Sequence, residues 1–249
     1  MIHYSNYNLR KISQKVKNKL TEIVNFFTVI TMITERKSRV SGHIPQPALS
    51  RLCKIYTLLE EMNEKGETSI SSHDIGKRLG VGSHNIRKDI GYLGEAGTSG
   101  AGYEIAKIKS SIEDTLGFKK ERNACIIGLG SLGSVIINYQ TLPFPCFNIV
   151  AGFDSNINKL ETIQTTIPVY PTYEIPAILE RDHIELAVVT EPDRNIEKIT
   201  ERLIEGGIKG IINFTPVLLS SPVESVSIRN IDIITEFRYL SALFTLNNK

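Results

Sequence analysis

Three glycines with the spacing of a phosphate-binding loop follow a short apolar segment in the second half of the chain. Residues 123–127 (NACII) are expected to form a strand, and Gly128, Gly130 and Gly133 follow it directly as G-x-G-x-x-G. The first glycine permits a tight turn, the second lets the backbone approach a pyrophosphate, and the third lets helix pack on strand. An apolar helix is expected next, with its N–H groups facing the phosphates. The predicted loop contacts also include Leu129, Ser131 and Leu132.

An acidic residue follows at the distance that ribose recognition requires. Residues 147–153 (FNIVAGF) are predicted to form a second strand that ends at Asp154, 21 residues beyond Gly133. A carboxylate there accepts hydrogen bonds from the adenosine ribose 2′-OH and repels a 2′-phosphate. The pattern therefore predicts NADH or NAD⁺ rather than the phosphorylated dinucleotides, and Lys159 is a further candidate contact. A glycine-rich turn in a non-binding α/β domain remains the alternative.

Further strands and helices alternate after this motif, as they do in a parallel sheet. Strands are expected at 168–171, 186–190 and 210–214, with a possible last strand at 228–232. Because ligands bind at the carboxyl ends of parallel strands, the residues following these strands are cofactor candidates. They are Thr190, Glu191, Pro192, Asn213 and Phe214. The apolar segment 236–246 predicts a terminal helix that packs in a core or an oligomer.

The groups that an NAD-dependent enzyme needs for proton transfer are missing from the expected places. The five histidines are His3, His43, His73, His84 and His183, and none follows a strand of the second domain. The segment also lacks a Ser-x-x-x-Tyr-x-x-x-Lys pattern, and we expect no substrate domain after it. These features favour a dinucleotide sensor without catalytic residues over an oxidoreductase, which stays the second hypothesis.

Residues 44–109 have the pattern of a winged helix-turn-helix domain. One apolar stripe runs from Leu49 to Met62, and a second short helix is expected to be capped by Ser72. The tight turn 80–82 then leads into a third helix, SHNIRKDIGYL, with Ser83 as its N-cap. Its polar face would enter the DNA major groove, which makes Ser83, His84, Asn85, Arg87 and Lys88 the DNA-binding candidates. Asp89 is expected to pair with an arginine or a backbone N–H, and the glycine-rich segment after Gly94 to form the wing.

A helical cap or dimerisation domain would show a similar pattern, and the charge distribution helps to choose. Residues 1–110 contain 17 Lys and Arg against 10 Asp and Glu, so this half carries +7 and the remainder −5. The positive net charge of residues 1–110 favours a polyanionic partner such as DNA. Chance clustering of solvated charged side chains would give the same net charge. Three cysteines without a C-x-x-C pair indicate a reducing cytoplasm and no cysteine metal site.

The length of 249 residues and an apolar fraction of 41% suit two globular domains and exclude a disordered chain. We expect an N-terminal extension (1–43), a winged-helix domain (44–109), a connector (110–122), a Rossmann domain (123–233) and a dimerisation helix (234–249). The apolar stretch 23–33 in the extension is too short to span a membrane.

The chain resembles the Rex family of redox-sensing transcriptional repressors from about Ile44 to Leu246. The resemblance rests on these segments: Ile44-Pro45, Arg51-Leu52, 86–89 (IRKD), 91–95 (GYLGE), 100–103 (GAGY), the loop 128–133, Phe153-Asp154, 207–210 (GIKG), 213–216 (NFTP) and Ile231-Asp232. It implies a homodimer whose C-terminal helices swap between subunits. It also implies that NADH releases the protein from palindromic operator DNA, whereas the NAD⁺-bound or unliganded form binds that DNA.

The resemblance further implies a switch. Tyr103 would lie at the cofactor site and donate a hydrogen bond to Asp232 of the partner subunit when the nicotinamide ring is absent. Two positions depart from the family pattern: Thr57 stands where the family has an arginine that pairs with the acid matching Asp232, and Ser99 where its wing carries Lys or Arg. An NAD-binding paralogue that has lost DNA binding is therefore a third hypothesis.

Overall fold

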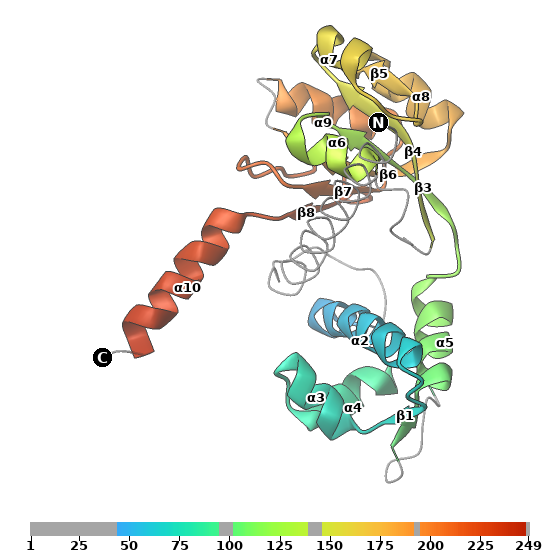
Figure 1. The fold of residues 1–249 in the computed structure, drawn as a ribbon, viewed down its shortest axis with the longest axis vertical. Coiled ribbons are helices and arrows are strands. Elements are labelled where there is room, and N and C mark those ends of the chain that lie inside the picture. The colour runs from blue at the N-terminus through green and yellow to red at the C-terminus, as the bar shows by residue number, and fades with distance from the viewer. Residues whose placement is uncertain (1–43, 95–101, 139–145, 192–194, 248–249) are drawn as a thin grey trace, which may run out of the picture. The chain divides into compact units, whose positions relative to one another are not determined.

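The computed structural model describes residues 44–94, 102–138, 146–191 and 195–247. The predicted N-terminal extension, the tip of the predicted wing with Ser99, and Pro192 lie outside these ranges. Residues 37–232 form one unit, which includes a helical and a sheet-containing body, and the C-terminal helix belongs to a second unit; each is described by itself (Figure 1). No helix in the described ranges is long and apolar enough to cross a membrane.

The helical body packs four helices around one apolar core. Its elements are α2 (Gln46–Glu64), β1 (Ser69–Ile70), α3 (Ser72–Leu79), α4 (Ser83–Gly91), β2 (Tyr103–Glu104) and α5 (Ile105–Leu116). The predicted apolar stripe of α2 is confirmed, because Leu52, Ile55 and Leu59 are completely buried. They pack with Ile86 of α4 and Ile112 of α5 in the same core.

The helix-turn-helix pair is α3 and α4, and its turn depends on small residues. Gly80 ends α3 with a φ of +65°, a conformation that glycine adopts without strain. A Cβ at Gly76 would lie 2.4 Å from the Val81 carbonyl oxygen, so the backbone of the turn packs directly on the backbone of Gly76. The N-caps of α3 and α4 were predicted one residue too far toward the C-terminus. Ser71 rather than Ser72 caps α3 by accepting from the Asp74 N–H, and Gly82 rather than Ser83 is the N-cap of α4.

The strand predicted at the end of the wing is confirmed as β2, whereas its antiparallel partner β1 was not predicted. The predicted connector differs from the structure. The next helix, α5, continues through residues 110–116 of the predicted connector, and its Ile108 and Ile112 are fully buried against the other helices. Phe118 packs edge-on against Tyr56 at 5.0 Å between ring centroids. Burial of these apolar groups therefore extends the helical body past its predicted end at residue 109.

The second body is a six-stranded parallel sheet in the order β5-β4-β3-β6-β7-β8. This is the strand order of the Rossmann fold, and it confirms the predicted fold class. Its strands are β3 (Arg122–Ile127), β4 (Phe147–Asp154), β5 (Val169–Pro171), β6 (Ile184–Val189), β7 (Gly210–Asn213) and β8 (Ser227–Asn230). The last strand ends at Asn230, two residues before the predicted end.

Helices cover both faces of this sheet, and the strand residues alternate accordingly. Cys125 and Ile127 of β3 join the core that contains α8 (Ile175–Arg181) and α9 (Ile196–Glu205). Ile126 between them faces the other side, where it packs with Ile137 of α6 (Ser131–Ile137) and residues near α7 (Ile157–Thr162). The short 3₁₀ helix η1 (Thr172–Glu174) precedes α8. Because β3 is covered on both faces, its last four residues, 124–127, are all apolar and buried, as is typical of central parallel strands.

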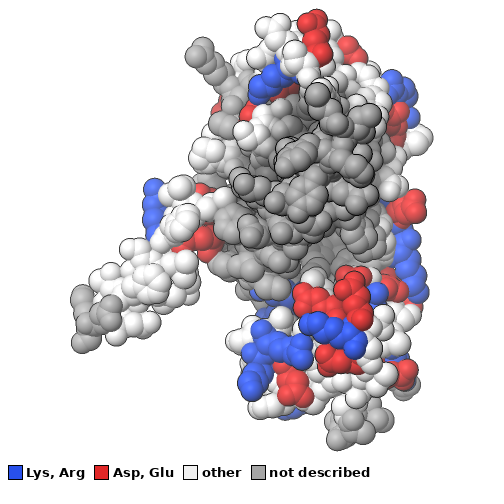
Figure 2. All heavy atoms as spheres, in the orientation of Figure 1, with Lys and Arg blue, Asp and Glu red and all other residues white. Residues whose placement is uncertain are grey.

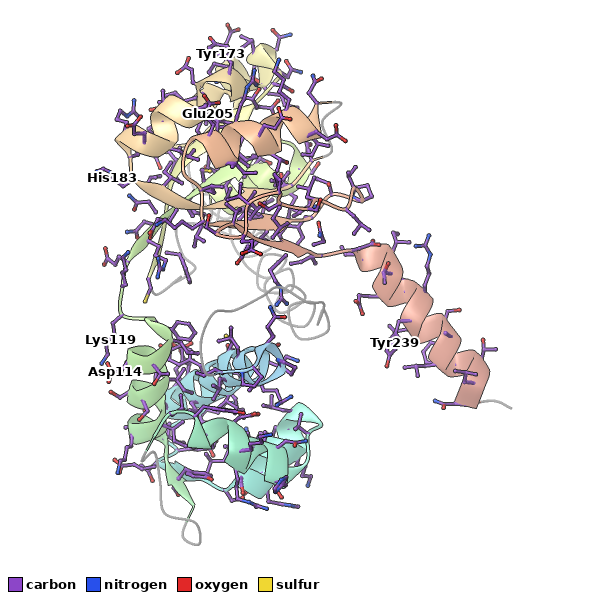
Figure 3. All side chains as sticks on the ribbon, turned by 180° about the vertical axis from the view of Figure 1, so that it is seen from behind. Asp114, Lys119, Tyr173, His183, Glu205 and Tyr239 are labelled. Atoms are coloured by element: carbon purple, nitrogen blue, oxygen red, sulfur yellow. The ribbon has the colours of Figure 1, made fainter. Side chains whose placement is uncertain are left out.

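The C-terminal helix α10 spans Ile233–Asn247 and is longer than the predicted 236–246. None of its described side chains is buried. Its large apolar side chains are 43–66% exposed: Ile234, Phe237, Tyr239, Leu240, Phe244 and Leu246. Tyr239 projects from the middle of this helix (Figure 3). The structure thus does not place this helix in a core, and the predicted oligomer contact stays a prediction.

A buried ion pair joins α4 to the rest of the helical body. Asp89 of α4 is 1% exposed, and both its carboxylate oxygens accept from Arg51 of α2, at 2.5 Å from Nε and 2.9 Å from Nη2. The prediction that Asp89 pairs with an arginine is confirmed. Because a bidentate pair has one favoured geometry, it fixes the rotation of α4 about its axis.

Arg51→Met should destabilise the helical body by about 2–4 kcal/mol, because it leaves the Asp89 carboxylate buried without this partner. The measurement is urea unfolding of the full chain, followed by helical circular dichroism. The control is Lys119→Ala, which removes the surface pair between Lys119 and Asp114 near the end of α5 (Figure 3). That variant should unfold at the wild-type urea midpoint. Equal midpoints for both variants would contradict a structural role for the Arg51–Asp89 pair.

Candidate functional site

The candidate site lies where the connections from two adjacent strands leave the sheet in opposite directions. Strands β3 and β6 are neighbours, and β4 and β7 flank them on either side. In open parallel sheets this reversal opens a crevice at the carboxyl ends of the strands, where ligands bind. Here β3 continues into the loop that begins at Gly128, and β6 continues into Thr190 and Glu191. The sequence predicted this placement of the loop.

The glycines of the loop are required by close contacts with backbone and with neighbouring side chains. Gly128 has a φ of +88°, and a Cβ there would lie 2.9 Å from the Glu191 Cβ. A Cβ at Gly133 would lie 1.8 Å from the Gly128 carbonyl oxygen, so helix α6 packs directly on the loop. The Thr190 hydroxyl donates to that same carbonyl at 2.6 Å. Thr190, predicted to contact the cofactor, is therefore buried and holds the loop in place.

Asp154 lies at the end of β4 and is joined to the loop. Its Oδ2 accepts from the Leu129 N–H at 2.7 Å, and its Oδ1 accepts from the Asn156 N–H at 2.8 Å. The side chain is 5% exposed. The structure thus brings the predicted ribose acid and the predicted phosphate loop together. It also shows a contact that the motif does not reveal, because the carboxylate fixes the loop that it adjoins.

Lys159 forms an ion pair that the sequence did not predict. Its Nζ lies 2.6 Å from Glu191 Oε2 and 3.4 Å from Asp154 Oδ2. The hydrogen bond to Glu191 raises the pKa of Lys159 more than partial burial lowers it, with Asp154 adding to the increase. The Glu191 carboxylate also reaches the loop, since a Cβ at Gly130 would lie 1.3 Å from its Oε1. Ser131 is exposed and Leu132 half-buried beside this point.

The side chain of Asn213, another predicted cofactor contact, forms its hydrogen bonds with neighbouring residues of the protein. It is completely buried, and its Nδ2 donates to the Val217 carbonyl and to Asn230 Oδ1, each at 2.7 Å. Its Oδ1 accepts from the Thr215 N–H at 3.0 Å. Phe214, the next residue, is half-buried. The Asn213 amide therefore shapes the segment that presents Phe214, and its described hydrogen bonds are all internal.

The predicted DNA-binding residues lie together on α4. His84, Asn85, Arg87 and Lys88 are exposed and Ser83 is half-exposed, while Ile86, Asp89 and Ile90 face the core. The Arg87 guanidinium donates to the Ser72 hydroxyl at 3.2 Å, which places it against the start of α3. The view in Figure 2 shows acidic side chains interleaved with basic ones on this body. The excess of positive charge in the first half of the chain does not make the side of this body that Figure 2 shows uniformly basic.

The residues of the implied switch lie on separate elements. Tyr103 in β2 is 7% exposed and belongs to the core of the helical body. Asp232 immediately precedes α10 and is half-buried. Thr57 lies on α2, where its hydroxyl donates to the Cys53 carbonyl at 3.4 Å. Within the described ranges, no cluster of three His, Cys, Asp or Glu residues could hold a metal ion.

These features define a two-domain protein with a helix-turn-helix domain and a dinucleotide-type Rossmann domain. Residues 43–90 match the family described as "Putative DNA-binding protein N-terminus", and residues 119–217 match "CoA binding domain". The redox-sensing transcriptional repressor Rex of Thermosipho africanus is 35% identical over 198 residues, which cover 80% of this chain and 94% of that protein. Rex 1 of Thermotoga maritima is 34% identical over 199 residues, with the same coverages. The chain belongs to the Rex family.

Solved structures agree with this assignment. RSP, a Rex-family repressor, superposes with a TM-score of 0.72 at 27% identity, covering 84% of this chain and 98% of that chain. RSP in complex with NADH superposes with the same TM-score at 25% identity, covering 84% and 97%. RSP in complex with NAD⁺ and operator DNA also has a TM-score of 0.72, at 27% identity, covering 84% and 94%.

Two glycine substitutions in the loop should lower the stability by very different amounts. Gly133→Ala places a methyl group against the Gly128 carbonyl and should cost about 1–3 kcal/mol, because the backbone must shift. Gly130→Ala meets only the flexible end of Glu191, and its φ of −76° suits alanine, so it should cost less than about 0.5 kcal/mol. Thermal unfolding of both variants checks this. A larger loss for Gly130→Ala would contradict the described packing.

Proposed function

We propose that this protein is a redox-sensing transcriptional repressor, which binds operator DNA through α4 and is released from it by NADH. The observation that carries the proposal is the hydrogen bond between Asp154 and the phosphate loop, in a chain that also presents the exposed face of α4. The complexes of RSP with NADH, and with NAD⁺ and operator DNA, support the same pair of ligands here.

The cofactor would lie across the carboxyl ends of β3, β4 and β6. The loop 128–133 would take the pyrophosphate and Asp154 the adenosine ribose, with Lys159 and Glu191 at the rim. The nicotinamide ring would lie near Phe214. Reduced nicotinamide is neutral and the oxidised ring is cationic, so the reduced form enters a mostly apolar pocket at the lower desolvation cost. That difference in affinity would make the protein respond to the NADH/NAD⁺ ratio.

The protein would act as a homodimer on palindromic DNA. The exposed apolar side chains of α10 support a subunit contact, and we propose that this helix swaps between subunits. In the DNA-binding state Tyr103 would donate to the partner subunit's Asp232, and NADH would replace that contact. Thr57 stands where the resemblance implies an arginine, and its hydroxyl bonds within its own helix instead, so we expect weaker operator binding.

We propose no catalytic role and a cytoplasmic location. Two side chains that line the crevice in the described ranges make structural contacts. The Thr190 hydroxyl donates to the Gly128 carbonyl, and Lys159 forms an ion pair with Glu191. None of the described histidines follows a strand at the carboxyl edge of the sheet. An oxidoreductase of this class would instead turn over NADH with a small carbonyl compound, and a steady-state absorbance assay separates the two hypotheses.

Asp154→Ala should weaken NADH binding by roughly ten- to a hundredfold, because a charged acceptor for the ribose hydroxyls is lost. The affinity for NADPH should change less, since repulsion of its 2′-phosphate is lost as well. Isothermal titration with both dinucleotides measures the two dissociation constants. Glu201→Ala on the exposed face of α9 is the charge-matched control and should bind like wild type. An unchanged preference in Asp154→Ala would contradict the ribose assignment.

Arg87 and Lys88 should affect operator binding in different ways. Lys88→Ala should reduce the slope of log K against log salt by about one, as the loss of one phosphate contact requires. Arg87→Ala should cost about 1–3 kcal/mol and relax specificity at one base position. Gel shifts across a salt series and an operator-variant panel measure both effects. Lys198→Ala on α9 is the matched control. If neither α4 variant changes binding, α4 does not contact DNA.

A further inference from the structure

One carboxylate occupies the space that the phosphate loop leaves open. The Glu191 Oε1 lies where a side chain on Gly130 would begin, 1.3 Å from the position of such a Cβ. Its Oε2 is held by Lys159 at 2.6 Å. Lys159 in turn lies 3.4 Å from Asp154 Oδ2, so one cation bridges two carboxylates. Glu191 and Lys159 are about one-third exposed, so both side chains can turn toward solvent.

The place that Glu191 occupies has a defined use in a dinucleotide loop. The second glycine of the motif lacks a side chain so that the pyrophosphate can approach the backbone. A pyrophosphate and a carboxylate cannot share this space, for reasons of both volume and charge. Any ligand whose phosphates sit on Gly130 must therefore displace the Glu191 side chain.

On the basis of the proposed function, we infer that Glu191 sets the affinity for dinucleotides by competing with the pyrophosphate for the position next to the Gly130 backbone. In the absence of a ligand, the Glu191 carboxylate occupies that position and pairs with Lys159. When the ligand binds, Glu191 turns away and Lys159 exchanges the carboxylate for a phosphate oxygen. A lysine ammonium is charged at neutral pH without the contact to Glu191, so Lys159 offers a cation to either anion.

This competition concerns the phosphates and not the nicotinamide ring. NADH, NAD⁺ and ADP-ribose share one pyrophosphate, so each must displace Glu191 at the same cost. Glu191 would therefore determine the concentration range over which the protein responds, and leave the preference for NADH over NAD⁺ unchanged.

The test is Glu191→Gln, which keeps the size of the side chain and removes its charge. Isothermal titration should give dissociation constants for NADH, NAD⁺ and ADP-ribose that are all lower by the same factor, roughly three- to tenfold, as for loss of a partly exposed ion pair. Lys159→Met should weaken all three ligands, because the cation that receives the phosphate is gone. Glu201→Gln on α9 is the matched control and should bind like wild type.

Three results would overturn the inference while the proposed function stands. Equal affinities for wild type and Glu191→Gln would show that the carboxylate does not compete. Weaker binding by Glu191→Gln would show that Glu191 contacts the ligand favourably. A change confined to NAD⁺ would show that Glu191 responds to the charge of the ring. If neither wild type nor Glu191→Gln binds any of the three ligands, the inference and the proposed function both fail.

Discussion

The hydrogen bond from the Leu129 N–H to the Asp154 carboxylate is the contact on which the dinucleotide site depends. It joins the loop after β3 to the end of β4 in a region where the aspartate is almost completely buried. Thr190 holds the same loop from the β6 side through the Gly128 carbonyl. The loop is thus fixed from both neighbouring strands, and it can present its backbone to a ligand without rearranging.

A buried carboxylate has the equivalent role in the helical body. Asp89 and Arg51 fix α4 against α2, so the exposed face with Arg87 and Lys88 is presented by a rigid element. Such rigidity matters for a repressor, because ligand binding can control DNA binding only if the recognition helices move as units. The Arg51–Asp89 pair therefore holds α4 in one orientation relative to α2.

Local patterns allowed much of this structure to be predicted. The phosphate loop, the strand ending at Asp154 and the outward face of α4 each depend on residues close in sequence, and all three were located correctly. A structural partner for Asp89, an arginine or a backbone N–H, was also predicted, and the partner is Arg51. The missed features depend on tertiary contacts. Lys159 meets Glu191 from 32 positions away, β1 and β2 form only against each other, and α5 extends past residue 109 because Ile112 is buried.

The central claim is that NADH binding to the Rossmann domain releases the protein from DNA. The direct measurement is a titration of the protein–operator complex with NADH and, in parallel, with NAD⁺, followed by fluorescence anisotropy of a labelled palindromic operator at fixed salt. We expect NADH to dissociate the complex at a far lower concentration than NAD⁺. Release by both at the same concentration, or no release by NADH at concentrations that saturate its site, would contradict the claim.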